Sequence, residues 1–307
     1  MDWNDVRLIA EVGRTGSFAG AAVALGVSKP TVTRRVAYLE QTAKARIFRR
    51  GPRGAKLTFV GEQLVRRAAS IETAVVDFER LVRTAGGGAR PVISAKMSEG
   101  VASYLMTPAL SGESVGPLGA AVTRAGLKLP AMKLLPLGAA ERADISIVWT
   151  SHGELPRAGP TDKVRKLADI RFVPFSSDRY GGKRGAPRRF DELAGHRLIT
   201  MSAYRSFASH SWAEWHDMAA AGGDTIVVEW SSALDVLVRG GAGVGLLPTY
   251  APLYADRLLP LDIRTPPMFG TLWMLCADEA YQDPPVRDCF GTLGKLFKAA
   301  DWMNEPA

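Results

Sequence analysis

Apolar residues at the start of the chain recur every three to four positions, which predicts consecutive helices. The first helix covers residues 3–13, and its buried face is formed by Val6, Leu8, Ile9 and Val12. The second begins after Ser17, a favourable cap, and ends at Gly26. Its inner side is small and apolar, with Phe18, Ala21, Ala22 and Leu25. We expect Val27, directly after the glycine turn, to be buried in the same core.

A third helix begins at Ser28, because serine caps helices and Pro30 is tolerated in a first turn. Its inward positions, spaced by four and then three, are Val32, Val36 and Leu39. Two helices joined by a glycine turn, the second with hydroxyls and cations on its outer side, indicate a helix-turn-helix that enters a DNA major groove. Hydroxyls suit base edges, and Arg or Lys suits guanine or phosphate. We therefore predict DNA contacts at Ser28, Lys29, Pro30, Thr31, Thr33, Arg34 and Arg35.

A short hairpin is predicted after these helices. Ile47 and Phe48 form one strand, residues 51–54 a glycine-rich turn, and residues 56–58 the returning strand. Such a hairpin is typical of the wing of a winged helix. The wing's basic residues would lie on the DNA backbone or in the minor groove: Arg49, Arg50, Arg53 and Lys56.

From Thr58, which we expect to cap it, a long helix runs to about residue 85. Its apolar positions alternate in steps of four and three and form a heptad seam: Leu64, Ala68, Ile71, Val75, Phe78 and Val82. The simplest partner for this seam is the same helix of a second subunit, and the alternative is packing onto its own chain. Residues 86–88, three glycines, would end the helix as a hinge.

In the second half of the chain, short apolar strands alternate with helices, which predicts an α/β unit with parallel sheets. Strands are expected at residues 91–95, 143–149, 171–176, 198–201, 225–230, 243–247 and 272–276, and helices at 101–110 and 234–238. Residues 111–136 are rich in glycine and proline, so we expect an irregular segment there.

The net charge of +8 is concentrated at the start of the chain. Residues 1–67 hold 13 basic and 5 acidic residues, whereas the other 240 residues hold 26 of each. A charge excess confined to one segment favours a surface that faces phosphates.

Other function classes find little support in the sequence. No apolar run is long enough to span a membrane, and the acidic, polar start does not resemble a signal peptide. Cys276 and Cys289 match no metal spacing, and His210 and His216 are six apart, too far for one helix face. The unpaired cysteines and the absence of a signal peptide or membrane span favour a cytoplasmic protein. The sequence contains no nucleophile elbow or P-loop, so we expect that the protein is not an enzyme and has no catalytic residue, metal or cofactor.

The sequence resembles the LysR-type transcriptional regulators. The match in the first half lies at Ala21, Ala22, Ser28, Pro30, Val32, Thr33, Arg34, Leu39, Glu40, Ile47, Phe48, Arg50, Arg53, Leu57 and Thr58. Residues 141–148, 177–196 and 240–248 resemble the family's later segments. Lys29 replaces a usual glutamine, Thr33 a usual serine, and Gly100 a frequent serine.

The resemblance implies a winged helix-turn-helix at residues 1–58, a linker and dimerisation helix with its hinge at 59–88, and an effector domain at 89–307. The effector domain would be a two-lobed α/β fold of the periplasmic-binding-protein type (type II). Its lobes would cover about 90–163 with 265–300, and about 164–264. The implied partners are double-stranded DNA, a small-molecule effector, further copies in a homodimer or dimer of dimers, and RNA polymerase.

An effector would lie where strands end and helices begin, since helix N-termini offer free amides there. This argument predicts contacts at Met97, Ser98, Glu99, Gly100, Trp149, Thr150, Met201, Ser202, Tyr204, Ser231, Ser232, Pro248 and Thr249. The favoured hypothesis is a regulator whose sequence-specific operator binding changes with an effector. The alternative is a constitutive DNA-binding oligomer without one.

Overall fold

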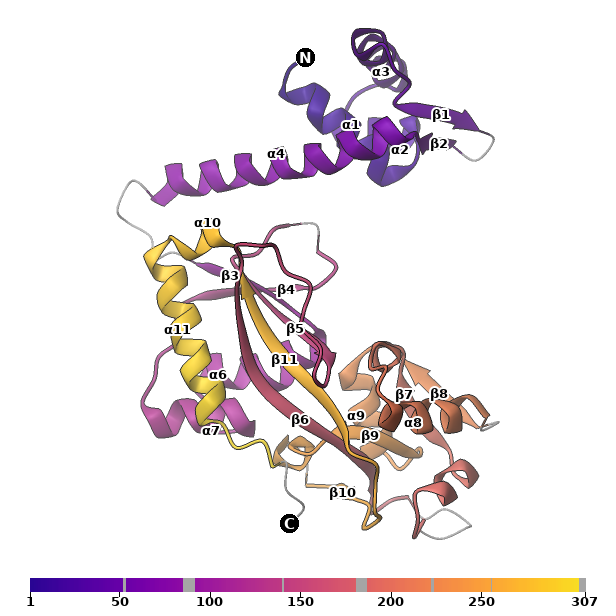
Figure 1. Cartoon of the computed structure of the whole chain (residues 1–307), viewed down its shortest axis with the longest axis vertical. Helices are drawn as coiled ribbons and strands as arrows, with labels where there is room; N and C mark the ends of the chain where they lie inside the picture. Colours follow the sequence, from indigo (N-terminus) through magenta and orange to yellow (C-terminus); the bar gives the residue numbers. More distant parts are fainter. Residues whose placement is uncertain are drawn as a thin grey trace. The chain divides into compact units, whose positions relative to one another are not determined.

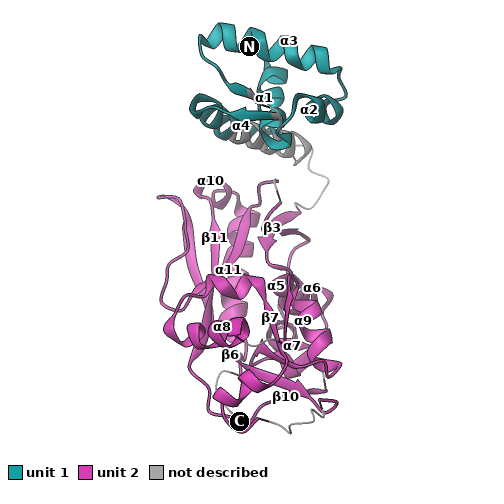
Figure 2. Ribbon diagram, turned by 90° about the vertical axis from the view of Figure 1, so that its right-hand side faces the viewer, with its two compact units in different colours: residues 1–89 teal, residues 90–307 magenta. Residues whose placement is uncertain are grey.

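A computed structural model describes residues 1–51, 54–84, 92–139, 141–180, 187–221, 224–254 and 256–303. The chain divides into two compact units, residues 1–89 and residues 90–307 (Figures 1 and 2). No helix among the described residues is both long and apolar enough to cross a bilayer.

The first unit is a winged helix-turn-helix followed by a long helix. Its elements are α1 (Trp3–Thr15), α2 (Phe18–Leu25), α3 (Lys29–Ala43), β1 (Phe48–Gly51), β2 (Gly54–Leu57) and α4 (Phe59–Thr84). β1 and β2 pair antiparallel. The buried core contains Leu8, Ile9, Val12, Ala21, Ala22, Val32, Val36, Leu39, Ile47 and Phe48.

Side-chain caps set the helix boundaries. The hydroxyl of Ser17 accepts from the Gly20 amide at 2.9 Å, and that of Thr58 accepts from the Gly61 amide at 3.1 Å. Gly26 adopts the left-handed conformation with φ +66°, which glycine alone adopts without strain. The expectation for Val27 was wrong: it is 41% exposed, because the turn at Gly26 leaves it in a surface groove beside Thr31 and Arg34.

The apolar seam of α4 divides between two environments. Ala68 is buried within the unit, and Leu64 packs against the core. α4 passes close to α1 here, since a Cβ on Gly13 would lie 2.7 Å from Val65 Cγ2. Farther along, Ile71 is 43% and Phe78 66% exposed. Packing on its own chain thus accounts for the first positions of the seam but not for the later ones.

The predicted hinge, residues 86–88, lies outside the described residues, as does the side chain of Val82.

The second unit contains one mixed sheet in the order β4-β3-β5-β11-β6-β9-β7-β8, with β10 also paired to β6 (Figure 1). Its strands are β3 (Ile93–Met97), β4 (Met132–Pro136), β5 (Ile145–Ser151), β6 (Lys163–Ser177), β7 (Leu198–Met201), β8 (Thr225–Val228), β9 (Val244–Pro248), β10 (Leu258–Pro260) and β11 (Met268–Cys276). β3, β4 and β5 are parallel, and so are β7, β8 and β9.

The predicted parallel pairing is present within each of these two groups of strands, but the middle of the sheet is antiparallel. The long strands β6 and β11 pair antiparallel with each other. β11 also pairs antiparallel with β5, and β6 pairs antiparallel with β9. They connect the two parallel groups, as the two crossovers of a two-lobed type II fold do. Local apolar patterning does not distinguish this arrangement, because a strand buried on both faces reads alike in either direction.

The helices of the second unit are α5 (Glu99–Val101), the π-helix η1 (Ala102–Met106), α6 (Thr107–Ser111), α7 (Gly116–Ala125), α8 (His210–Ala221), α9 (Ser231–Arg239), α10 (Asp278–Tyr281) and α11 (Pro284–Ala299), with 3₁₀ turns η2 (Asp191–Gly195), η3 (Ser202–Ser206) and η4 (Ala251–Tyr254). Residues 111–136 are more regular than expected, because Gly112 and Gly126 serve as left-handed helix ends on either side of α7.

Both cysteines are buried, and burial raises the thiol pKa of Cys276 to about 11 and of Cys289 to about 12, which disfavours the reactive thiolate.

Candidate nucleic-acid interface and ligand pocket

The first turn of α3 presents a polar surface. Ser28, Lys29, Pro30, Thr31 and Arg34 are exposed, and Thr33 is half-buried. Ser28 Oγ accepts from the Thr31 amide at 3.3 Å and lies 2.8 Å from Thr31 Oγ1. The cap therefore holds one hydroxyl against the next, while Val32 and Val36 anchor the opposite face in the core.

Arg35 has a partner that the sequence reasoning missed. Its Nη2 donates to Asp2 at 2.7 Å, and its Nε donates to the fully buried carboxylate of Asp5. Burial alone would raise the pKa of Asp5, but Arg35 and the Asp2 amide lower it below its ordinary value. Arg35 thus ties the recognition helix to the start of α1. The capping-box spacing of Asp2 and Asp5 was the available signal.

Glu40 connects α3 to the wing. Its Oε1 accepts from the amides of Ile47 at 2.9 Å and Phe48 at 3.0 Å, and its Oε2 accepts from Arg46 at 2.8 Å. Burial would raise the pKa of Glu40, but these donors lower it below its ordinary value. On the wing, Arg49 and Lys56 are exposed and opposite each other in register. Arg53 and the side chain of Arg50 lie outside the described residues.

Replacing Glu40 with glutamine should lower the free energy of unfolding of the first unit by about 1–3 kcal/mol at pH 7. A carboxylate whose pKa is lowered in the folded state stabilises the folded protein at pH values above its unfolded pKa, near 4.3. This stabilisation is lost as the pH falls through the folded-state pKa. The deficit of E40Q should therefore shrink below about pH 4. Hydrogen exchange at the Ile47 and Phe48 amides, followed as a function of pH, measures this loss of stability. The substitution Glu62→Gln at an exposed position serves as the control. A deficit that does not change with pH would contradict this role.

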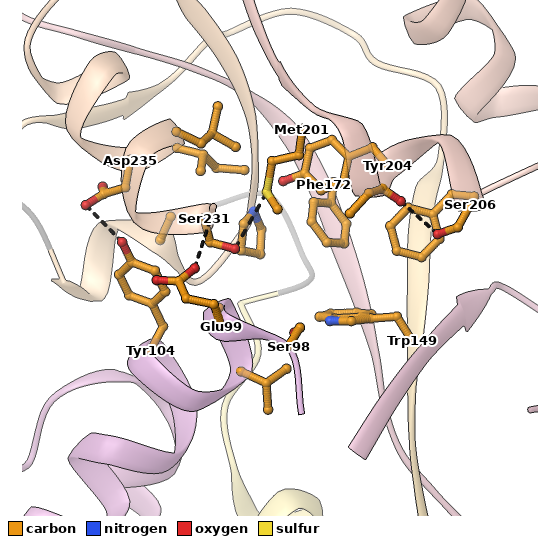
Figure 3. Close-up of a pocket in the computed structure, with 18 of the residues that line it drawn as sticks. Ser98, Glu99, Tyr104, Trp149, Phe172, Met201, Tyr204, Ser206, Ser231 and Asp235 are labelled. Carbon is orange, nitrogen blue, oxygen red and sulfur yellow. Dashed lines mark hydrogen bonds between the residues drawn. The ribbon is translucent and has the colours of Figure 1, made fainter. Parts of the chain in front are cut away.

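The second unit contains a cavity of about 300 Å³ at the ends of several strands (Figure 3). Eight of the predicted contact residues line it: Ser98, Glu99, Gly100, Trp149, Met201, Tyr204, Ser231 and Pro248. They follow or end β3, β7 and β9, lie near the end of β5, or begin α9. A cavity of this size is at the lower end of the range for small-molecule sites.

Five predicted residues do not line the cavity. Met97 is buried within the core. Two use their hydroxyls elsewhere: Thr150 accepts from Trp273, and Thr249 donates to the carbonyl of Trp302. The hydroxyl of Ser202 donates to Glu229, which does line the cavity. The fifth is Ser232, whose amide is 3.4 Å from Glu99 Oε2.

The sequence reasoning missed most of the aromatic wall. Phe172 lies in the interior of the long strand β6, and Tyr104 lies a turn beyond Glu99. Other missed lining residues are Phe207, Glu229, Asp235, Tyr250 and Tyr254. The tyrosines at 250 and 254, four apart after a strand end, were the one local signal.

Two carboxylates organise one side of the cavity (Figure 3). Glu99 Oε2 accepts from the Ser231 amide at 2.9 Å, at the N-terminus of α9. Asp235 Oδ2 accepts from the Tyr104 hydroxyl at 3.2 Å and pairs with Arg239. Burial, with the nearby carboxylates of Asp235 and Glu99, raises the pKa of Tyr104 well above its ordinary value. Tyr104 is therefore a neutral hydroxyl donor at physiological pH.

Gly100 is required for the approach of α5 to α9. A Cβ at this position would lie 2.4 Å from Ser231 Oγ and 3.0 Å from Ser231 Cβ. Replacing Gly100 with serine should therefore displace Ser231 and destabilise the second unit by about 1–3 kcal/mol. Thermal unfolding measures this, with Gly138→Ser, where a Cβ meets nothing within 4 Å, as the matched control. Equal melting temperatures of the two variants would show that the contact between residue 100 and Ser231 is not tight.

Two family models match the chain. The bacterial regulatory helix-turn-helix protein model of the lysR family covers residues 3–62, and the LysR substrate binding domain model covers residues 132–298. The regulator AbaB of Streptomyces antibioticus is 29% identical over 259 residues, 81% of this chain and 82% of AbaB. CrgA of Neisseria meningitidis serogroup B is 27% identical over 201 residues, 64% of this chain and 62% of CrgA.

Solved structures show the same fold along the whole chain. CbnR, a LysR family transcriptional regulator, aligns with a TM-score of 0.58 at 18% identity, over 98% of this chain and 100% of CbnR. A structure of CbnR with its target DNA aligns with the same score, at 19% identity, over 97% and 100% of the two chains. The winged helix-turn-helix, the mixed two-lobed sheet and the two family models together show that this chain is a transcriptional regulator of the LysR family.

Proposed function

We propose that the protein binds operator DNA as a dimer and that a small molecule in the cavity changes this binding. Residues 1–58 would bind DNA, residues 59–88 would dimerise, and residues 89–307 would bind the effector, with lobes at about 90–163 with 265–300 and about 164–264. The observation that carries the proposal is the aromatic cavity of about 300 Å³ in the same chain as a basic winged helix.

At the DNA, Lys29, Thr31, Thr33 and Arg34 would contact bases, because they lie on the outer side of α3. The wing residues Arg49, Arg50, Arg53 and Lys56 would contact phosphates. Arg35 would act indirectly, since Asp2 and Asp5 orient its guanidinium.

The cavity distinguishes this proposal from a constitutive DNA-binding oligomer. A unit that only oligomerises would gain stability by filling the space between Trp149, Phe172 and Tyr204. An aromatic hollow with few polar groups is the usual form of a small-molecule site.

A thermal-shift screen of metabolites on the full chain, followed by DNA titration, tests the proposal. We expect at least one compound that raises the melting temperature to change DNA affinity by about fivefold or more, a typical coupling between two sites. Compounds that bind in the cavity without any change in DNA affinity would support the constitutive alternative.

A further inference from the structure

The N-terminus of α9 is the natural anion site of the cavity, and the chain's own carboxylate occupies it. Free amides and the helix dipole attract negative charge at such a position. Here Glu99 Oε2 accepts from the amide of Ser231 at 2.9 Å (Figure 3). It also accepts from the amide of Ser232 at 3.4 Å. Gly100 allows this approach, because any side chain there would meet Ser231. A carboxylate ligand would have to displace Glu99.

The charged side chains among the cavity's described lining residues are all carboxylates. Glu99, Glu229 and Asp235 line it, and within the described part of the chain its lining includes no Lys or Arg. Arg239 pairs with Asp235 and offsets that charge. Glu229 accepts from the Ser202 hydroxyl at 2.5 Å, and no ion pair with a described residue offsets its charge. Because Glu229 has no cationic partner among the described residues, a bound anion would be repelled there and a cation would be attracted.

Aromatic rings form the opposite wall. The Trp149 ring lies 5.7 Å from that of Phe172 and 6.0 Å from that of Phe207, both nearly edge-to-face. Faces of such rings attract ammonium groups, most strongly at tryptophan, and they also pack against an apolar body. A cavity lined by carboxylates and aromatic rings is suited to a protonated amine.

We propose that the cavity binds an organic ammonium, a protonated amine on an apolar or aromatic body, and discriminates against carboxylates. This inference rests on the proposed function, in which the cavity is the effector site. Glu229 would receive the ammonium, Trp149 and Phe172 would pack on the body, and Glu99 would exclude anions from α9.

Three probes of similar size and different charge test the proposal: 2-phenylethylamine, 2-phenylethanol and phenylacetate. Ligand-observed NMR titration of the full chain should give an amine affinity about tenfold or more above that of phenylacetate, with the alcohol between them. Equal or tighter binding of phenylacetate overturns the inference, and so does a failure of all three to bind at millimolar concentration.

Two variants locate the discrimination. E229Q should weaken the amine by about tenfold and leave the alcohol unchanged, because only the charge is removed. E99A frees the amides of α9, so phenylacetate should bind about tenfold more tightly than it binds the wild type. Glu113→Gln, at an exposed carboxylate outside the cavity, should change none of these affinities. Unchanged affinities in both E229Q and E99A would overturn the assignment.

The same titrations, repeated with DNA, separate the two proposals. If phenylacetate binds better and changes DNA affinity, the ammonium inference fails and the effector function survives. If the amine is preferred but DNA affinity does not change, the inference survives and the effector function fails.

Discussion

A glutamate in place of Ile71 or Phe78 should convert the proposed dimer into a monomer. The two residues lie seven apart on α4, hence on one face, and are 43% and 66% exposed in the single chain. In a dimer this face would be buried against its copy, and an unpaired charge there would be costly. We expect dimerisation to weaken by about a hundredfold or more, which corresponds to about 3 kcal/mol.

Sedimentation of the full chain measures this change. Gln63→Glu, an exposed position on the same helix, introduces the same charge away from the face and should leave the dimer intact. A wild-type monomer, or variants with unchanged mass, would contradict the proposed interface. Because two linked half-site contacts bind far more tightly than one, the monomers should also lose most of their DNA affinity.

Alanine at Arg34 should weaken specific DNA binding by about tenfold to a hundredfold, with a smaller effect on non-specific DNA. Arg34 lies on the exposed side of α3 and makes no hydrogen bond or ion pair with the described residues. Its guanidinium is therefore available to a base edge. Fluorescence anisotropy with a specific and a scrambled duplex measures both affinities.

Arg35→Ala is the matched comparison, because the adjacent arginine is already bound by Asp2 and Asp5. It should lower the melting temperature of the first unit, whereas Arg34→Ala should not. If Arg34→Ala reduced specific and non-specific binding equally, Arg34 would be a phosphate contact and not a base contact.

The first unit was predictable from the sequence because its determinants are local. Ser17, Ser28 and Thr58 cap helices within three residues of themselves, and Val32, Val36 and Leu39 follow one helical period. A contact between segments far apart in the sequence left no trace in the local pattern, and could not be predicted from it. Arg35 looked like another outward cation, but its partner Asp5 lies 30 residues earlier.

For the cavity too, residues with a local sequence signal were predictable and residues placed by distant contacts were not. The rule that ligands bind at strand ends led to Ser98, Trp149, Met201 and Pro248. It could not lead to Phe172, because a residue in the middle of a strand joins the site only through the antiparallel course of β6. That course depends on pairing with β9 and β11, which lie far along the chain.

Selection of binding sites from a random DNA pool with the full-length protein tests the account most directly. A dimer that presents two α3 helices to DNA should enrich an inverted repeat, whose half-sites are separated by about one turn of the DNA helix or a multiple of it. Arg34→Ala should lose base preference at one position in each half-site. Enrichment of an unrepeated site, or of no sequence at physiological salt, would contradict the account.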